Sequence, residues 1–299
     1  MNDVSWKLFP PVGNVDVVLD TDAYNEVDDQ FAIAYLLRSA AKLRTCAIYA
    51  APFLNVRSET PADGMEKSFD EIQNILSLTE ESVPVFRGAM HYMPDESTPV
   101  VSPAALDLID RASTYSPERP LYVVAIGAIT NVASALLIEP EIAKNLVVVW
   151  LGGHAHHYHD TNEFNMRQDI AAARVAMRNA GAFVQLPCRG VVDLFTLSRG
   201  DMLHYFEDKN PLCDYLLAHS IEQLDEEFGG TNWSKPLWDV TAIAWLLFTD
   251  KRTLATREEK LRLPDYEGGY EPPCEDVSIG YVYHLRRDPI LADLVDKIV

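Results

Sequence analysis

The sequence has few cysteines, and their positions argue against a fold held together by disulfides. The four of them, Cys46, Cys188, Cys213 and Cys274, are scattered along 299 residues and form no CxxC pair. A chain of this length can bury a sizeable hydrophobic core without such links. Because reduced thiols are typical of the cytosol, we expect a cytoplasmic protein.

Long apolar runs and positive charge are also scarce. No uninterrupted stretch of about 18 apolar residues occurs, which is the length that spans a bilayer, and the N-terminal stretch lacks the pattern of a secretion signal. There are 25 Lys and Arg residues against 45 Asp and Glu residues, which gives a net charge of -20. That charge repels nucleic acids and anionic membranes, so we expect neither as a partner. A neutral small molecule or a cation is compatible with it.

What the sequence does contain is an alternation of short β-branched runs with helical patterns. Strands are predicted over 15–19, 44–51, 83–88, 121–127 and 145–153, and helices over 29–42, 63–78, 129–140 and 169–181. Further strands are expected at 182–188 and 189–195, helices within 199–226, 237–248 and 287–298, and an antiparallel excursion over 261–285. This order predicts an α/β fold with a mostly parallel central sheet flanked by helices on both faces. No linker divides the chain, so we expect one domain over 1–299.

Five carboxylates gather where the first predicted strand meets the first predicted helix. They are Asp20, Asp22, Glu26, Asp28 and Asp29. Helix capping accounts for one or two acids at such a place, but packing five like charges is costly unless a cation neutralises them. In a parallel sheet this edge is also where ligands bind. Oxygen ligands in this number suit Ca²⁺ or Mg²⁺, so the pattern favours a metal site over capping alone.

The stretch LDTDAYNEVDDQFAIAYLL (19–37) resembles the N-terminal signature of the inosine-uridine nucleoside hydrolase family, a DxDxxxDD strand-turn-helix that holds one Ca²⁺. Four later segments resemble further motifs of that family in the same order: AAPFLN, VVAIGAITNVASALLIEP, WLGGHAHHYHDTNEFNMRQDIAAARVA and SKPLWDVTAIAWLL. The similarity covers most of the chain from 15 to 250. It implies a nucleoside hydrolase-like fold and Ca²⁺-dependent hydrolysis of the N-glycosidic bond of ribonucleosides. A homo-oligomer, dimer or tetramer, is also implied.

The resemblance assigns roles to individual residues. The implied Ca²⁺ ligands are the side chains of Asp22, Asp29 and Asp239 and the backbone carbonyl of Ile126. The implied ribose contacts are Asp28, Asn55, Glu163 and Asn165. Asp22 is also the expected catalytic base, which accepts a proton from the attacking water. Asp20 is expected to support the loop from behind.

Two positions bear on the leaving base. Where some relatives have a His before the last Ca²⁺-binding Asp, this chain has Trp238, which resembles the purine-preferring subgroup and implies stacking on the base. Core packing beside a buried helix is the alternative. The run HAHHYH (154–159) is open to three interpretations: a solvated loop, a base-contacting loop that carries an acid, or a zinc site. No cysteine lies near it, which disfavours zinc, and His157 is the candidate substrate contact.

The chain departs from the family pattern in its first turn. Five residues, AYNEV, separate Asp22 from Asp28, where the family usually has three. We therefore expect the turn to bulge and to bring Glu26 toward the metal or the substrate. A reshaped pocket leaves two alternatives open: a hydrolase of another N-riboside or sugar, and a non-catalytic ribose- and Ca²⁺-binding protein. A mere binder would not need Asp22 as a base, which argues against the second.

Overall fold

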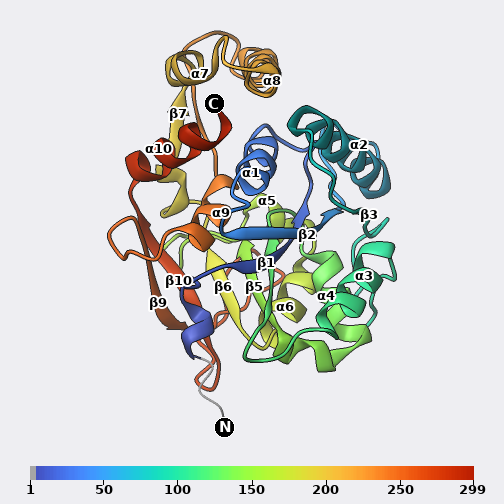
Figure 1. Cartoon of the computed structure of the whole chain (residues 1–299). Coiled ribbons are helices and arrows are strands. Elements are labelled where there is room, and N and C mark those ends of the chain that lie inside the picture. The colour runs from blue at the N-terminus through green and yellow to red at the C-terminus, as the bar shows by residue number, and fades with distance from the viewer. Residues whose placement is uncertain (1–4) are drawn as a thin grey trace.

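In the computed structural model, which describes residues 5–299, one eight-stranded sheet runs through the molecule (Figure 1). Its strand order is β3-β2-β1-β4-β5-β6-β10-β9. The strands are β1 (Val15–Thr21), β2 (Leu43–Ala50), β3 (Val85–Arg87), β4 (Leu121–Ala125), β5 (Leu146–Leu151), β6 (Phe183–Leu186), β9 (Leu254–Lys260) and β10 (Ser278–Leu285). All neighbouring pairs are parallel except β9 with β10. This confirms the predicted mostly parallel sheet.

Helices cover both faces of the sheet, because the side chains of each strand alternate between two cores. In β1, Val17 and Leu19 belong to one buried cluster and Val18 to the other. On the first face lie α1 (Asp28–Leu37), α2 (Pro61–Thr79), α7 (Arg199–Phe206), α8 (Pro211–Glu227), α9 (Val240–Leu247) and α10 (Arg287–Ile298). On the second lie α3 (Pro103–Ala112), α4 (Thr130–Ile138) and α6 (Ile170–Asn179). The predicted α/β class is therefore confirmed.

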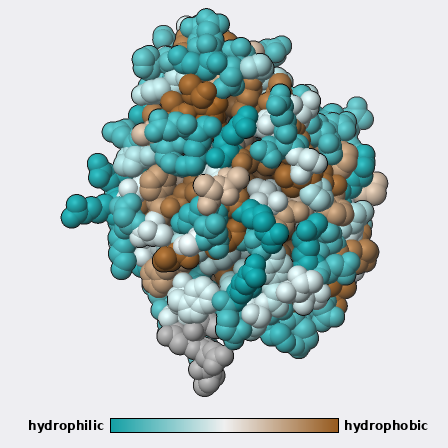
Figure 2. Space-filling model, viewed as in Figure 1, coloured by the Kyte–Doolittle hydropathy of each residue, from teal (hydrophilic) through white to brown (hydrophobic). Residues whose placement is uncertain are grey.

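The remaining elements are short. They are η1 (Ser5–Leu8), η2 (Pro140–Asn145), η3 (Val192–Leu194), α5 (Phe164–Gln168) and the antiparallel pair β7 (Thr196–Ser198) and β8 (Ser234–Pro236). In Figure 1 the α7 and α8 helices extend beyond α1 at the top of the molecule. The same view in Figure 2 shows a mostly hydrophilic surface with scattered apolar residues. Within residues 5–299, no helix combines the length and apolarity needed to cross a membrane.

The structure differs from the sequence-based expectations in three segments, although the predicted antiparallel excursion does contain β10. The segment 189–195 is no strand but contains η3, because the backbone N–H of Val192 donates to the carbonyls of Pro187 and Cys188 and the chain turns. The antiparallel strand β9 begins at Leu254, ahead of the predicted excursion, and 261–277 carries no named strand. The α3 helix was not predicted, although its start is capped by Ser102, whose hydroxyl accepts from the backbone N–H of Ala105.

The parallel strands place one set of polar residues at a common edge. Asp22 directly follows β1 and Ile126 directly follows β4, and these two strands pair side by side. Helix α1 begins on this edge with Asp28 and Asp29, and Asp239 is the N-cap of α9. All of α1 and nearly all of α9 is buried in the first core. Two rigidly packed helices therefore point their N-termini at the ends of β1 and β4.

Candidate active site

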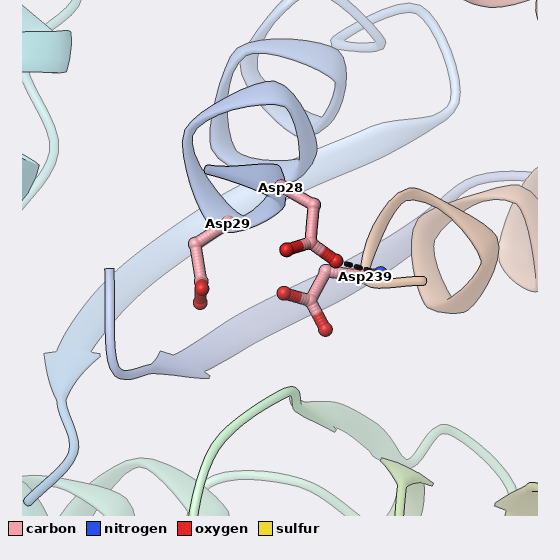
Figure 3. A group of neighbouring side chains, drawn as sticks. All are labelled: Asp28, Asp29 and Asp239. Atoms are coloured by element: carbon pink, nitrogen blue, oxygen red, sulfur yellow. Dashed lines mark hydrogen bonds between the residues drawn. The ribbon is translucent and has the colours of Figure 1, made fainter. Parts of the chain in front are cut away.

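Three carboxylates converge at the starts of α1 and α9. Asp28, Asp29 and Asp239 each offer one oxygen atom, and these atoms lie within 4.8 Å of one another (Figure 3). Asp28 Oδ2 accepts a hydrogen bond from the backbone N–H of Asp239 at 3.2 Å, and Asp29 Oδ1 accepts one from the Thr21 hydroxyl at 2.5 Å. All three side chains are buried. Among the described residues, this is the group whose composition and spacing fit a metal ion.

The electrostatics of the group support a cation. Burial raises the pKa of Asp28 to about 6, although the nearby Lys235 charge opposes that rise. Burial, followed by repulsion from neighbouring carboxylates, raises the pKa of both Asp29 and Asp239 well above the ordinary range. These directions mean that the protein alone does not neutralise the negative charge that it gathers here. A hard cation with oxygen ligands fits that deficit.

Asp22 lies beside this group rather than within it. Its carboxylate is buried, and neither oxygen has a hydrogen-bond partner among residues 5–299. The pKa of Asp22 is raised well above normal, first by burial and then by the charge of Asp29. It also approaches Gly127 so closely that a Cβ atom there would lie 2.9 Å from Asp22 Oδ1. Glycine at 127 thus leaves room for two buried acceptor oxygens that await a ligand.

A cavity of about 240 Å³ opens over the carboxylates. It is lined by Asn25, Glu26, Asp28, Asp29, Ile126, Leu151, His154, Asn162, Glu163, Phe164, Asn165, Arg167, Cys188, Arg189, Trp238 and Asp239. The structure therefore brings together seven of the residues singled out in the sequence: Asp28, Asp29, Ile126, Glu163, Asn165, Trp238 and Asp239. Asp22, Asn55 and His157 do not line this cavity, although Asp22 lies beside Asp29 beneath it.

Glu163 and Asn165 are held rigidly by the backbone around them. Glu163 is the N-cap of α5, and its two oxygens accept from the backbone N–H groups of Gly153, Asn165 and Met166, each at 2.9 Å. Burial nevertheless raises the pKa of Glu163 to about 7. The side-chain amide of Asn165 donates to the carbonyls of Ile126 and Leu151 at 3.1 and 3.0 Å. The Asn165 side-chain oxygen and the remaining Glu163 lone pairs are left for a ligand.

Asp20 and Asn55 support the site from outside the cavity. Burial raises the pKa of Asp20 to about 7, and its Oδ1 accepts from Asn131 Nδ2 at 2.8 Å. Asn55 Nδ2 donates to Asn25 Oδ1 at 2.6 Å, which ties the end of β2 to the long first turn. Asn55 lines a second cavity of about 770 Å³, which shares Asn25 and Glu26 with the first. The two cavities are therefore neighbours across that turn.

The residues of the histidine loop line two different cavities. The chain turns at Gly153, whose φ of +74° suits glycine, and the next residue, His154, lines the carboxylate cavity. Burial lowers the pKa of His154, and its Nδ1 accepts from the backbone N–H of Arg189 at 3.4 Å. His156 packs on Tyr281 of β10, and His157 lines a separate cavity of about 400 Å³ beside β9 and β10. Within residues 5–299, these histidines form no group of three potential metal ligands.

The five-residue first turn brings Glu26 to a lysine that sequence reasoning missed. Lys235, in β8, is only 6% exposed, pairs with the Glu26 carboxylate and lies 4.4 Å from the centroid of the Trp238 ring. Its ammonium therefore covers one face of the indole. Trp238 is half-buried against the first core but also lines the cavity. Trp238 therefore packs against the core and also lines the cavity, and its stacking on a base stays a prediction.

The known proteins that this chain resembles include named nucleoside hydrolases. The sequence model of the family described as inosine-uridine preferring nucleoside hydrolase matches residues 17–269. The pyrimidine-specific ribonucleoside hydrolase RihA of Salmonella arizonae is 26% identical over 276 residues, which are 81% of this chain and 82% of that protein. The non-specific ribonucleoside hydrolase RihC of Salmonella enteritidis is 26% identical over 269 residues, with 81% of each chain covered. The structure of a purine-preferring ribonucleoside hydrolase from Gardnerella vaginalis shares the fold, with a TM-score of 0.72 at 20% identity over 95% of this chain and 98% of that one.

The buried pair of Lys235 and Glu26 predicts an effect on stability. Removing one partner of a buried pair usually costs about 3–5 kcal/mol. We expect Lys235→Met to lower the free energy of unfolding by about 3 kcal/mol, the lower end of that range. The lower end applies because the Glu26 side chain is 33% exposed and water screens the charge that remains. Denaturant unfolding measures the change. Lys144→Met is the matched control, since Lys144 and its partner Glu141 are exposed and their pair should contribute little. Equal losses in both variants would contradict the prediction.

Proposed function

The chain belongs to the inosine-uridine preferring nucleoside hydrolase family, as its motifs predicted, and on that premise we propose that it is a Ca²⁺-dependent enzyme that hydrolyses ribonucleosides to free base and ribose. The observation that carries the proposal is the group formed by Asp28, Asp29 and Asp239 at the C-terminal edge of the parallel strands. Two relatives that cover most of the chain, RihA and RihC, are named ribonucleoside hydrolases, which supports the reaction.

The donor set supports Ca²⁺ as the cation. Asp28, Asp29 and Asp239 would hold it by their carboxylates, together with the carbonyl of Ile126, and Asp22 lies beside them next to Asp29. Asp28, which the sequence resemblance assigned to the ribose, joins this set because its oxygen lies with those of Asp29 and Asp239. Oxygen donors without nitrogen or sulfur are the choice of a hard cation. When bound, such an ion neutralises the carboxylates and makes a water molecule in the site more acidic.

The other residues of the site have separate roles in the proposed reaction. Asp22, whose oxygens have no partner among the described residues, accepts a proton from the attacking water. Glu163 and Asn165, both fixed by backbone hydrogen bonds, hold the ribose hydroxyls. As positive charge develops on the sugar ring, the buried Glu163 carboxylate interacts with it more strongly than with the neutral substrate. Because the surrounding backbone already orients these groups, little reorganisation is needed during the reaction.

The preferred base is a purine. The relatives named above include pyrimidine-specific, non-specific and purine-preferring enzymes, so their names do not decide the preference. The support comes from Trp238, which lines the cavity beside the carboxylates and carries Lys235 over one face of its indole. An aromatic face gains more contact from a two-ring base than from a one-ring base.

A second candidate is the hydrolysis of an N-riboside with a larger leaving group. The observation that favours it is the neighbouring cavity of about 770 Å³, which meets the carboxylate cavity at Asn25 and Glu26. A base larger than a purine has room there. This candidate keeps the same sugar, the same cation and the same bond broken, and differs only in what departs.

The proposal is tested by a screen of nucleosides with and without a chelator. Purified protein should release ribose from inosine in the presence of Ca²⁺, and a chelator should abolish the release because the carboxylates then repel one another and lose their ligand. Ribose release is measured directly, and re-addition of Ca²⁺ should restore it. Release that is insensitive to the chelator would remove the cation from the mechanism. If no N-riboside releases ribose, the protein binds its ligand without hydrolysing it.

Asp22 is the residue whose loss should affect turnover most. We expect Asp22→Asn to lower kcat by at least about 10²- to 10⁴-fold, the usual contribution of a general base, while the circular dichroism spectrum stays native. The exposed Asp110 on α3 supplies a matched control, since Asp110→Asn removes the same charge far from the cavity. Near-normal turnover in folded Asp22→Asn protein would assign the base role elsewhere.

Trp238 should determine the base preference. We expect the ratio of kcat/KM for inosine to that for uridine to exceed one in the wild type and to collapse in Trp238→Ala, chiefly through a lower kcat on inosine. The physical reason is that stacking which favours a protonated purine strengthens toward the transition state. Steady-state kinetics on both substrates measure the ratio. An unchanged ratio in the variant would leave Trp238 as a packing residue only.

A further inference from the structure

The cavity over the carboxylates has a cationic side that hydrolysis of a neutral nucleoside does not use. Arg167 and Arg189 line it together with the buried acids. Both arginines are exposed, and within residues 5–299 neither forms an ion pair with an acidic side chain. The chain carries 45 acidic residues against 25 basic ones, so acidic partners for an arginine are plentiful. Two arginines without acidic partners at one cavity favour the binding of an anionic ligand.

Arg189 extends from a backbone that is fixed on both sides. Its N–H donates to Nδ1 of the buried His154 at 3.4 Å, and its carbonyl accepts from the N–H of Ala155 at 3.0 Å. The next residue, Gly190, has a φ of +88°, and a Cβ atom there would lie 3.0 Å from the Cβ of Ala155. The loop that follows β6 is therefore locked onto the histidine loop. The backbone of Arg189 is thus held in place, and its exposed side chain lines the cavity.

Arg167 reaches the cavity from a different element. It lies in the last turn of α5, the helix whose start is capped by Glu163. Its guanidinium carbon is 5.3 Å from the centroid of the Phe164 ring, and Phe164 also lines the cavity. The aromatic ring limits the directions that the guanidinium can take. Two guanidinium groups from two separately anchored segments thus border the same space.

We propose that Arg167 and Arg189 bind an anionic group of the substrate, so that the preferred substrate class is a negatively charged ribonucleoside rather than a neutral one. This inference rests on the proposed function for the ribose and the bond broken. Guanidinium groups bind phosphate and carboxylate through paired N–H donors, and a neutral ribonucleoside offers neither. The anion is a phosphate on the sugar or a carboxylate on the base.

The second cavity is not where this group binds. Its wall contains the acids Glu26, Glu222, Glu226 and Glu227 and a single arginine, Arg57. An anion entering there meets a net negative wall and is repelled. The carboxylate cavity is also lined by five acids, but Glu26 pairs with Lys235 and the proposed cation would offset Asp28, Asp29 and Asp239, which leaves Glu163 against Arg167 and Arg189. The two cavities therefore direct the anionic end of a substrate to one side and its neutral or cationic end to the other.

The net charge of -20 opposes the approach of an anion from a distance. That repulsion is screened beyond roughly 8 Å at physiological ionic strength, whereas contacts with arginine act at hydrogen-bond range. The arginines therefore act once the ligand is in the cavity with the proposed cation bound, and the long-range charge lowers the association rate. We expect the anion preference to grow, not to vanish, when added salt screens the distant acids at moderate concentration.

The experiment measures binding and turnover separately. Calorimetry compares ribose 5-phosphate with ribose, and orotidine, which carries a carboxylate on its base, with uridine. We expect one anionic member to bind about 10- to 100-fold more tightly than its neutral counterpart, the usual range for charge-assisted hydrogen bonds. Arg189→Ala and Arg167→Ala should each lose most of that advantage, and Arg189→Lys should keep part of it. Arg252→Ala is the control, because Arg252 is exposed and lines neither cavity.

Turnover on uridine, uridine 5′-phosphate and orotidine follows in the same variants. A higher kcat/KM for the phosphate places the anion on the sugar, and a higher value for orotidine places it on the base. The inference is overturned if neither anion improves binding, or if the improvement survives in both alanine variants. Absence of hydrolysis on every substrate overturns the proposed function instead, because the binding comparison does not depend on turnover.

Discussion

Repulsion among buried carboxylates is the main physical constraint on the structure of the site. Four of them, Asp22, Asp28, Asp29 and Asp239, lie where β1 and β4 end and where α1 and α9 begin. Each helix N-terminus supplies roughly +0.5 of a charge, so the two together offset about one carboxylate of the four. Lys235 adds a full charge, but Glu26 already pairs with it. The remaining negative charge is the physical basis of the proposed cation site.

Holding such charges together requires rigid supports, and the two helices supply them. All ten residues of α1 are buried, and α9 is apolar on every side, so neither helix has a solvent-facing stripe. The two helices pack against each other, α1 also contacts α2 and α10, and α9 contacts β5 of the sheet. A helix fixed on all sides cannot tilt to relieve repulsion at its first turn. The packing energy of the first core thus maintains an arrangement that the carboxylates alone would oppose.

The sequence allowed the fold class and the carboxylate edge to be predicted, because both depend on local patterns. Strand and helix periodicities are set by neighbouring residues, and an acid that follows a parallel strand must lie at the ligand-binding edge. The placements that local patterns did not determine depend on tertiary contacts. The chain turns at Gly153, whose φ is positive, and His154 then lines the carboxylate cavity whereas His157 lines a separate one. Lys235, Arg167 and Arg189 carry no motif, and only the folded chain shows which acids they meet or avoid.

The hydrogen bond between Asp28 and the backbone of Asp239 joins residues 211 positions apart, and the pair of Glu26 and Lys235 spans 209. Contacts of such separation form late, because the loop that they close must be ordered first. Synthesis from the N-terminus releases the DTDAYNEVDD segment long before the segment that completes its surroundings. Until residue 239 has left the ribosome, those acids have no place to converge, and they remain hydrated and apart. The group of carboxylates is therefore one of the last parts of this molecule to be completed, although its first members are among the earliest residues made.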